Sequence, residues 1–148
     1  MLETVLGSIW WLIVALGILV TFHEFGHFWV ARRLGVKVTR FSVGFGRPLW
    51  SRNAKDGVEY VIAAIPLGGY VKMADERDGD VSEADLPRAF NRQTLGARTA
   101  IVAAGPAFNF VFAFVVYWLL FMAGETGLRP ILDTPPGDTV AAEAGFLA

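Results

Sequence analysis

The chain has 148 residues, of which 54% are hydrophobic and 18% charged, with a formal net charge of −1. It contains no cysteine, which excludes a disulfide-stabilised scaffold, and its apolar content excludes an intrinsically disordered chain. No net positive charge is available to hold nucleic acid, so with a mean hydropathy of +0.46 the chain is a very apolar soluble domain or a membrane protein.

The first element in chain order is a long uncharged segment. Residues 4–22 carry no charged side chain, which at a rise of about 1.5 Å per residue is long enough to cross a hydrocarbon core of about 30 Å. A cleavable signal peptide is the alternative. However, the residues before the segment include Glu3 and no Lys or Arg, and no clear cleavage site follows the segment. The sequence therefore predicts a first transmembrane helix over residues 1–34, followed by Gly35 as the glycine that ends it.

The end of this predicted helix carries a His-Glu-x-x-His motif. His23 and His27 are four residues apart, so they project from one helix face and can both reach one tetrahedral Zn²⁺. Glu24 is offset around the helix, where a carboxylate can take a proton from a water at the metal. Counted back from Arg32, the motif lies about 8–13 Å below the membrane surface, a depth at which three ionisable groups need a function. We therefore favour a zinc site over two hydrogen-bonded core histidines.

Strand patterns follow the first helix. Apolar and polar residues alternate through residues 36–45, which include the flexible Gly44-Phe45-Gly46, and a second strand-like run covers residues 59–65. Pro66 is expected to break this run before a short extended segment at residues 71–73. Two interpretations stay open: a small cytoplasmic antiparallel sheet, or a sheet that dips toward the metal and accepts an extended peptide at its open edge.

Two polar segments separate the strands from the next apolar run. Residues 75–85 are rich in Asp and Glu and are expected to form a solvated loop. Residues 85–98 mix apolar and basic side chains, which is compatible with an interfacial segment at the membrane or with an ordinary polar connector.

A second uncharged run predicts a second transmembrane helix over residues 99–124. Within it, Gly105-Pro106 predicts a kink or a helix start. Asn109 is a polar group in this apolar run, and it is expected either to form a hydrogen bond between helices or to act in the site, by holding a substrate backbone or orienting the site.

The basic residues predict the topology. Of the 13 Lys and Arg residues, all except Arg129 lie between residues 32 and 98. The positive-inside rule therefore places residues 32–98 in the cytoplasm and both ends of this chain on the opposite face, which is the periplasm in a Gram-negative cell.

A third zinc ligand is harder to find. The chain has only two histidines. Three candidate acids, Glu125, Asp133 and Asp138, lie just past the second apolar run and fall on the wrong face of the membrane for the motif. Since a catalytic zinc usually has three protein ligands, the ligand set within these residues is expected to be incomplete.

Several motifs, taken in order, resemble the site-2 protease family of intramembrane zinc metalloproteases over nearly the whole chain. They are His23-Glu24-Phe25-Gly26-His27, Gly44-Phe45-Gly46, the stretch from Pro66 to Met73, and Gly105-Pro106-Ala107-Phe108-Asn109-Phe110.

The resemblance implies a membrane protein, mainly α, with two transmembrane helices and a small cytoplasmic or membrane-re-entrant antiparallel β element between them. It implies Zn²⁺ as cofactor, with His23 and His27 as ligands and Glu24 as catalytic base. The resemblance implies five further substrate-binding residues: Gly44, Phe45 and Gly46 in a re-entrant hairpin, Tyr70 in the stretch that presents the substrate as an added strand, and Asn109 beside the zinc.

The resemblance also implies partners and a location. The substrate would be a membrane-spanning protein of the anti-sigma factor type in the inner membrane, cleaved within the lipid bilayer during envelope stress signalling. In this family an aspartate from the C-terminal half of the same protease completes the zinc ligands, and residues 125–148 resemble the entry to a periplasmic PDZ domain. A metal transporter or proton relay, and a catalytically inactive adaptor of the same fold, are the alternatives.

Overall fold

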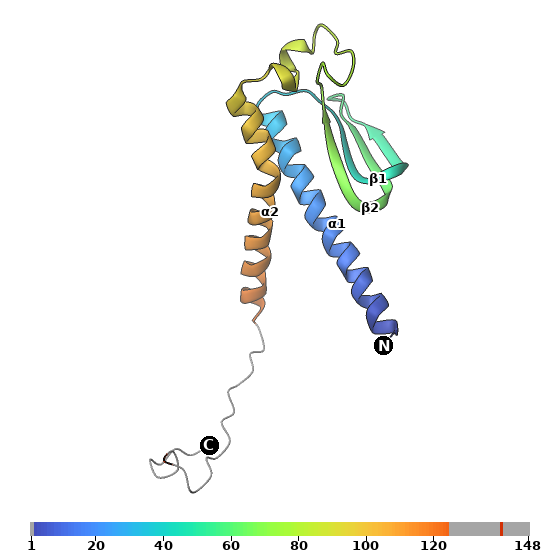
Figure 1. The fold of residues 1–148 in the computed structure, drawn as a ribbon, viewed down its shortest axis with the longest axis vertical. Coiled ribbons are helices and arrows are strands. Elements are labelled where there is room, and N and C mark those ends of the chain that lie inside the picture. Colours follow the sequence, from blue (N-terminus) through green and yellow to red (C-terminus); the bar gives the residue numbers. More distant parts are fainter. Residues whose placement is uncertain (1, 125–139, 141–148) are drawn as a thin grey trace. The chain divides into compact units, whose positions relative to one another are not determined.

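The computed structural model describes residues 2–124 and residue 140. Its elements in chain order are α1 (Leu2–Arg33), β1 (Val38–Asn53), β2 (Glu59–Met73), the 3₁₀ turns η1 (Leu86–Arg88) and η2 (Phe90–Arg92), and α2 (Leu95–Ala123), shown in Figure 1. Both α helices are long and apolar enough to cross a membrane, by length and composition. The predicted pair of long apolar helices with a small antiparallel sheet between them is therefore confirmed. All contacts described below lie within the compact unit formed by residues 1–116.

Helix α1 ends as its sequence predicts. Gly35 follows the last turn with a φ of +79°, a conformation that favours glycine. The Gly35 amide donates to the Arg32 carbonyl (3.1 Å) and the Val36 amide donates to the Ala31 carbonyl (2.9 Å). This pair of bonds is a Schellman motif, which satisfies carbonyls at the helix end and turns the chain toward β1.

Among residues 3–123, the buried residues of the two helices lie near their crossing and against the sheet. The buried residues of α1 are Gly26, Phe28 and Ala31, and those of α2 are Ile101, Ala104 and Gly105. Small side chains on both helices allow their backbones to approach closely. Away from the crossing, many large apolar side chains are exposed, for example Trp10, Trp11 and Phe114.

Helix α2 begins earlier than predicted. Its first residue is Leu95, so residues 95–98 of the expected interfacial segment already belong to the helix. The helix continues through Pro106, and the interpretation of Gly105-Pro106 as a helix start is therefore wrong. A proline removes only one intrahelical donor, and the long apolar helix on both sides tolerates that loss.

Both strands are long and bent. Residues 38–43 of β1 pair with residues 69–73 of β2, and residues 48–53 pair with residues 59–63. Residues 40–43 also lie beside residues 59–62, so this part of β1 sits between the two arms of β2. The prediction that Pro66 breaks the second strand is wrong, because β2 runs from Glu59 to Met73. Residues 66–68 have no partner in the register, so the missing amide of Pro66 costs no ladder hydrogen bond.

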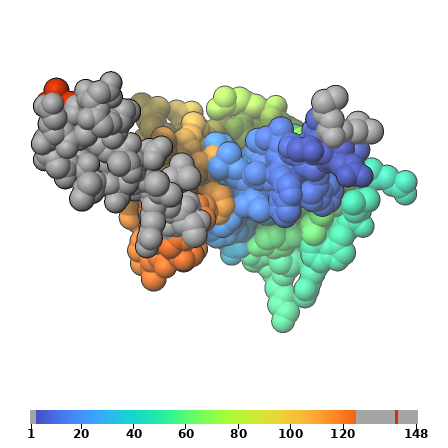
Figure 2. All heavy atoms as spheres, turned by 90° about the horizontal axis from the view of Figure 1, so that it is seen from below, coloured from blue at the N-terminus to red at the C-terminus, as the bar shows by residue number. Residues whose placement is uncertain are grey.

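Gly44 and Gly46 form the bend in β1. Their φ angles are +91° and +84°, and a Cβ on Gly44 would lie 2.8 Å from the Ile65 carbonyl oxygen. Only glycine meets both requirements at residue 44. Beyond the bend, β1 projects from the side of α1 as the turquoise arm in Figure 2, where Leu49 and Trp50 are exposed.

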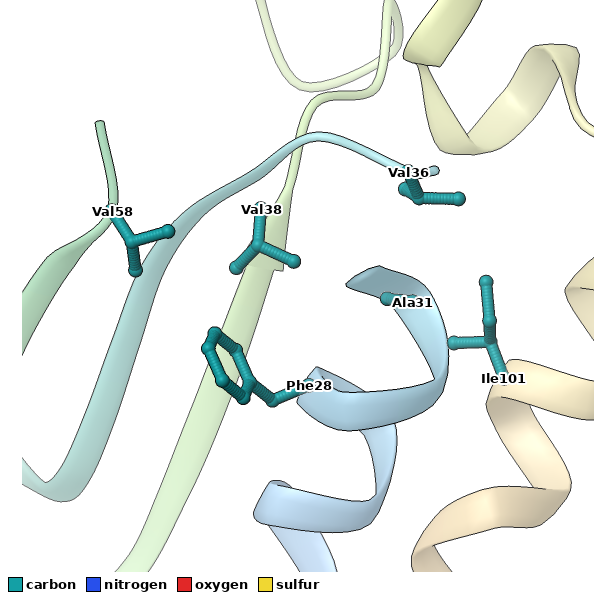
Figure 3. Packing of buried hydrophobic residues seen from close by; sticks show 6 residues of the cluster. All are labelled: Phe28, Ala31, Val36, Val38, Val58 and Ile101. Atoms are coloured by element: carbon teal, nitrogen blue, oxygen red, sulfur yellow. The ribbon is translucent and has the colours of Figure 1, made fainter. Parts of the chain in front are cut away.

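A hydrophobic core joins the end of α1 to the sheet and to α2. Its buried members are Phe28, Ala31, Val36, Val38, Val58 and Ile101, and Figure 3 shows them packed between the two helices and the strands. Phe28 directly follows His27 in the sequence, and Ile101 lies on the facing side of α2. The core therefore holds the part of α1 that directly follows the histidine motif against the sheet and α2.

The segment after β2 is held to the rest of the fold by backbone and charge contacts. The Phe90 amide donates to the Ala74 carbonyl (2.7 Å), and the Ala74 amide donates to the Lys37 carbonyl (2.8 Å). Arg92 donates to both carboxylate oxygens of Glu76 (2.6 and 2.9 Å), and Asn91 donates to one of them. The hydrogen bonds from Arg92, followed by those from Asn91, lower the pKa of Glu76 to about 2.

Candidate metal centre

The two motif histidines meet at their Nε2 atoms. His23 and His27 are both half-buried on α1, and their Nε2 atoms are 3.2 Å apart. Their rings lie edge to face, with centroids 4.9 Å apart and an interplanar angle of 82°. Two nitrogen ligands of one tetrahedral zinc, at about 2.0–2.1 Å from the ion, are about 3.3–3.4 Å from each other. The observed separation therefore fits two ligands of one zinc ion.

Helix α2 orients the outer nitrogen of His27. His27 Nδ1 donates to the backbone carbonyl oxygen of Ile101 at 2.7 Å. With the ring proton on Nδ1, the Nε2 lone pair is free for a metal, and a carbonyl partner of this kind also fixes the ring's orientation. Zinc-ligating histidines commonly have such a partner, so this contact is a second observation that fits a metal site.

Asn109 of α2 lies against the outer nitrogen of His23. Asn109 Nδ2 is 3.2 Å from His23 Nδ1, and Asn109 Oδ1 is buried without a hydrogen-bond partner. If His23 Nε2 binds a metal, the ring proton resides on Nδ1 and needs an acceptor. A half-turn of the amide presents Oδ1 to that proton with almost no change in shape. Asn109 is thus placed to orient His23 through a contact between the two helices.

Replacing Asn109 with Leu is expected to weaken zinc binding by about 10–100-fold, the usual effect of losing such a partner. The Asn109→Asp variant keeps an oxygen acceptor and is expected to bind zinc more tightly than the Leu variant. The measurement is a zinc titration against a competing chelator, with the native full-length protein that contains this chain. Equal affinity of the Leu variant and the wild type would contradict an orienting role.

Glu24 and His27 line a pocket of about 510 Å³. The pocket is lined by Glu24, His27, Ile101, Val102, Phe90, Asp75, Asp78 and residues 70–73 of β2. Gly69 allows β2 to approach α1 here, since a Cβ on Gly69 would lie 3.1 Å from Glu24 Cγ and 2.7 Å from the Ser42 carbonyl oxygen. The half-buried carboxylate is therefore next to one imidazole and to a strand edge.

The structure brings most of the predicted site residues together. His23, Glu24, His27 and Asn109 meet where α1 crosses α2, and Tyr70 lines the adjoining pocket. Gly44, Phe45 and Gly46 do not line this pocket; they form the bend of β1, and the Phe45 ring stacks parallel to the Tyr70 ring at 6.4 Å. Phe45 therefore lies beside Tyr70 but outside the pocket lining.

The third ligand is not found among the described residues. Within residues 2–124 and residue 140, no group of three or more His, Cys, Asp or Glu side chains is arranged to hold a metal. Glu125, Asp133 and Asp138 lie outside the described residues.

Two contributors to the site were not predicted. The Ile101 carbonyl acts through the main chain, so its side-chain identity carries no signal. Gly69 lies in the expected substrate-presenting stretch, but only the approach of β2 to α1 reveals its contact with Glu24.

The geometry is that of a metallopeptidase motif on an apolar helix, and comparison with known families agrees. The family model described as peptidase family M50 matches residues 11–145. The chain therefore belongs to peptidase family M50, which confirms the predicted resemblance to the site-2 proteases.

Individual relatives are similar over nearly the whole chain. The regulator of sigma-E protease RseP of Escherichia coli strain K12 is 58% identical over 132 residues, which cover 89% of this chain and 29% of that protein. The protease RseP of Yersinia pestis is 55% identical over 143 residues, which cover 97% of this chain and 32% of that protein. A Xylella fastidiosa protein that is 55% identical over 141 residues, covering 95% of this chain and 31% of that protein, is named provisionally as a zinc metalloprotease. The chain thus spans about a third of the length of these curated relatives.

Proposed function

We propose that this chain carries the zinc-binding motif and catalytic base of an intramembrane metallopeptidase. The observation that carries the proposal is the convergence of His23 Nε2 and His27 Nε2 at 3.2 Å beside the Glu24 pocket. Both outer nitrogens of these rings contact α2, at the Ile101 carbonyl and at Asn109. Contacts from α2 therefore orient both rings of α1, and outer partners of this kind support a metal centre.

The residues present divide the chemistry among them. A zinc ion bound by the two histidines would polarise a peptide carbonyl and lower the pKa of a water molecule toward 7. Glu24 would accept a proton from that water and then donate it to the leaving amine. The apolar surroundings strengthen the electrostatic interactions of these groups.

The edge of β2 is the proposed site for an extended substrate segment. Residues 69–73 pair with residues 38–43 on one side, and residues 70–73 line the pocket that also contains Glu24. A peptide added to this edge would gain main-chain hydrogen bonds and pass beside the catalytic carboxylate. A transmembrane substrate must unwind first, since a helical amide is shielded by its own turn. Tyr70, with Phe45 stacked on it, would lie beside the added substrate segment. Asn109 would act near the peptide bond of the substrate that is cleaved.

We further propose that both helices span the inner membrane, with residues 32–98 in the cytoplasm and both ends of the chain in the periplasm. The outward apolar faces support this, for example Trp11 at 69% and Phe110 at 78% exposed. The position of the basic residues supports the orientation. Residues 1–34, 35–84, 85–98, 99–124 and 125–148 keep their proposed roles as first span, β region with acidic loop, interfacial segment, second span and start of a PDZ domain.

The proposed substrate is a membrane-spanning protein of the anti-sigma factor type, and an aspartate from the C-terminal half of the same protease is the proposed third ligand. The sigma-E regulators among the relatives support this substrate class. The proposal places the chain in regulated intramembrane proteolysis.

The test uses the native full-length protein in liposomes with a labelled single-span substrate. We expect cleavage inside the apolar segment, loss of cleavage with a zinc chelator, and recovery on adding zinc. Metal uptake into sealed vesicles without cleavage would instead identify a transporter. Binding of the substrate without cleavage or uptake would identify an adaptor, and either result would refute the proposal.

A further inference from the structure

The backbone of α2 passes unusually close to the two motif imidazoles at Gly105. A Cβ placed on Gly105 would lie 2.4 Å from His27 Nε2 and 2.7 Å from His23 Nε2. It would also lie 2.6 Å from His27 Cε1. A methyl group at residue 105 would therefore fill the space that the two metal-binding nitrogens share.

Gly105 belongs to the face of α2 that contacts α1. Ile101, Ala104 and Gly105 are buried, and Asn109 contacts His23 from the same face, at the spacing i, i+3, i+4 and i+8. Ile101 and Asn109 orient the outer nitrogens of the two rings, and Gly105 lies between these two positions in the sequence. The outer contacts thus hold the rings so that their inner nitrogens point at the glycine.

We propose that Gly105 is a positioning residue of the metal centre, an inference that rests on the proposed function. Its missing side chain leaves room for a metal ion between His23 Nε2 and His27 Nε2, and the α2 backbone closes that side of the centre. The pocket that adjoins the centre is lined by Glu24 and His27 of α1, by residues 70–73 of β2 and by Ile101 and Val102 of α2.

The atoms that a Gly105 methyl would meet decide what the substitution does. They are the tips of two side chains, which can rotate away without moving either helix backbone. Gly26, on the same crossing, differs in this respect, because a Cβ there would lie 2.5 Å from the Ala104 backbone oxygen. Substitution of Gly105 should therefore displace the imidazoles while the helix pair stays intact.

The experiment compares Gly105→Ala with Gly96→Ala in the native full-length protein. Gly96 is a matched control on α2, since a Cβ there would meet nothing within 4 Å. Zinc affinity is measured by titration against a competing chelator, and folding by thermal unfolding in detergent with chelator present. We expect Gly105→Ala to lose zinc affinity by about 100-fold or more, beyond the effect of losing an orienting partner. Its unfolding temperature without zinc should match that of Gly96→Ala.

The other possible results distinguish failure of this inference from failure of the proposed function. Wild-type zinc affinity in Gly105→Ala would overturn the inference and leave the proposed function standing. Failure of Gly105→Ala to fold would also overturn it, because the contact would then be one of helix packing. Absence of zinc from the wild type would overturn the proposed function itself.

Discussion

Replacing Glu24 with Gln is expected to lower the rate of peptide hydrolysis by about 10²–10⁴-fold, the usual contribution of a general acid–base group. The amide keeps the shape of the side chain but cannot accept a proton from water. The proposed zinc ligands in this chain are the imidazoles of His23 and His27, and Glu24 is not a ligand. The variant should therefore retain wild-type zinc content. Single-turnover cleavage of a labelled membrane substrate and zinc analysis of the same sample provide the two readouts.

Glu3→Gln is the matched control for this substitution. Glu3 lies on the same helix in the exposed first turn, so its loss should change neither cleavage nor zinc content. Wild-type cleavage by Glu24→Gln would exclude Glu24 as the base. Loss of zinc from Glu24→Gln would show that the carboxylate binds the metal instead.

The second large effect is expected at Gly26, where α1 and α2 cross. A Cβ on Gly26 would lie 2.5 Å from the Ala104 backbone oxygen and 2.9 Å from the Phe108 ring. Because a backbone atom cannot rotate away, Gly26→Ala should push the helices apart and destabilise the fold by about 1–3 kcal/mol, as overpacking does. The measurement is the thermal unfolding temperature in detergent.

Zinc binding should fall in the same variant. Both orienting contacts, from Ile101 to His27 and from Asn109 to His23, come from α2 and lengthen when the helices separate. Gly7→Ala is the control, since a Cβ at Gly7 would meet nothing within 4 Å and the substitution stays on α1. An unfolding temperature for Gly26→Ala equal to that of Gly7→Ala would show that the crossing is looser than described.

The chemistry of the site could be predicted from local spacing, because a helix fixes which side chains share a face. His23 and His27 needed only their separation of four residues, and the end of α1 needed only Gly35. The pairing of these rings with Ile101 and the close approach of Gly105 could not be predicted in this way. Both depend on where α2 crosses α1, and no local pattern encodes that position.

The β region also shows that tertiary contacts could not be predicted from local sequence patterns. The alternation of residues 36–45 predicts a strand, and the structure has β1 from Val38. Local propensity placed a break at Pro66, but a proline is compatible with a bent strand wherever its neighbours lack a ladder partner. The register between β1 and β2 decides this, and it is a tertiary property.

The central claim is that His23 and His27 together bind one zinc ion. X-ray absorption spectroscopy of zinc in the native full-length protein tests it most directly. The account predicts two imidazole nitrogens at about 2.0–2.1 Å from the metal in the wild type. Each of the His23→Ala and His27→Ala variants, where it still retains zinc, should show one imidazole nitrogen at that distance. Wild-type protein that carries no zinc after exposure to it, or zinc whose imidazole signal is unchanged by both substitutions, would contradict the account.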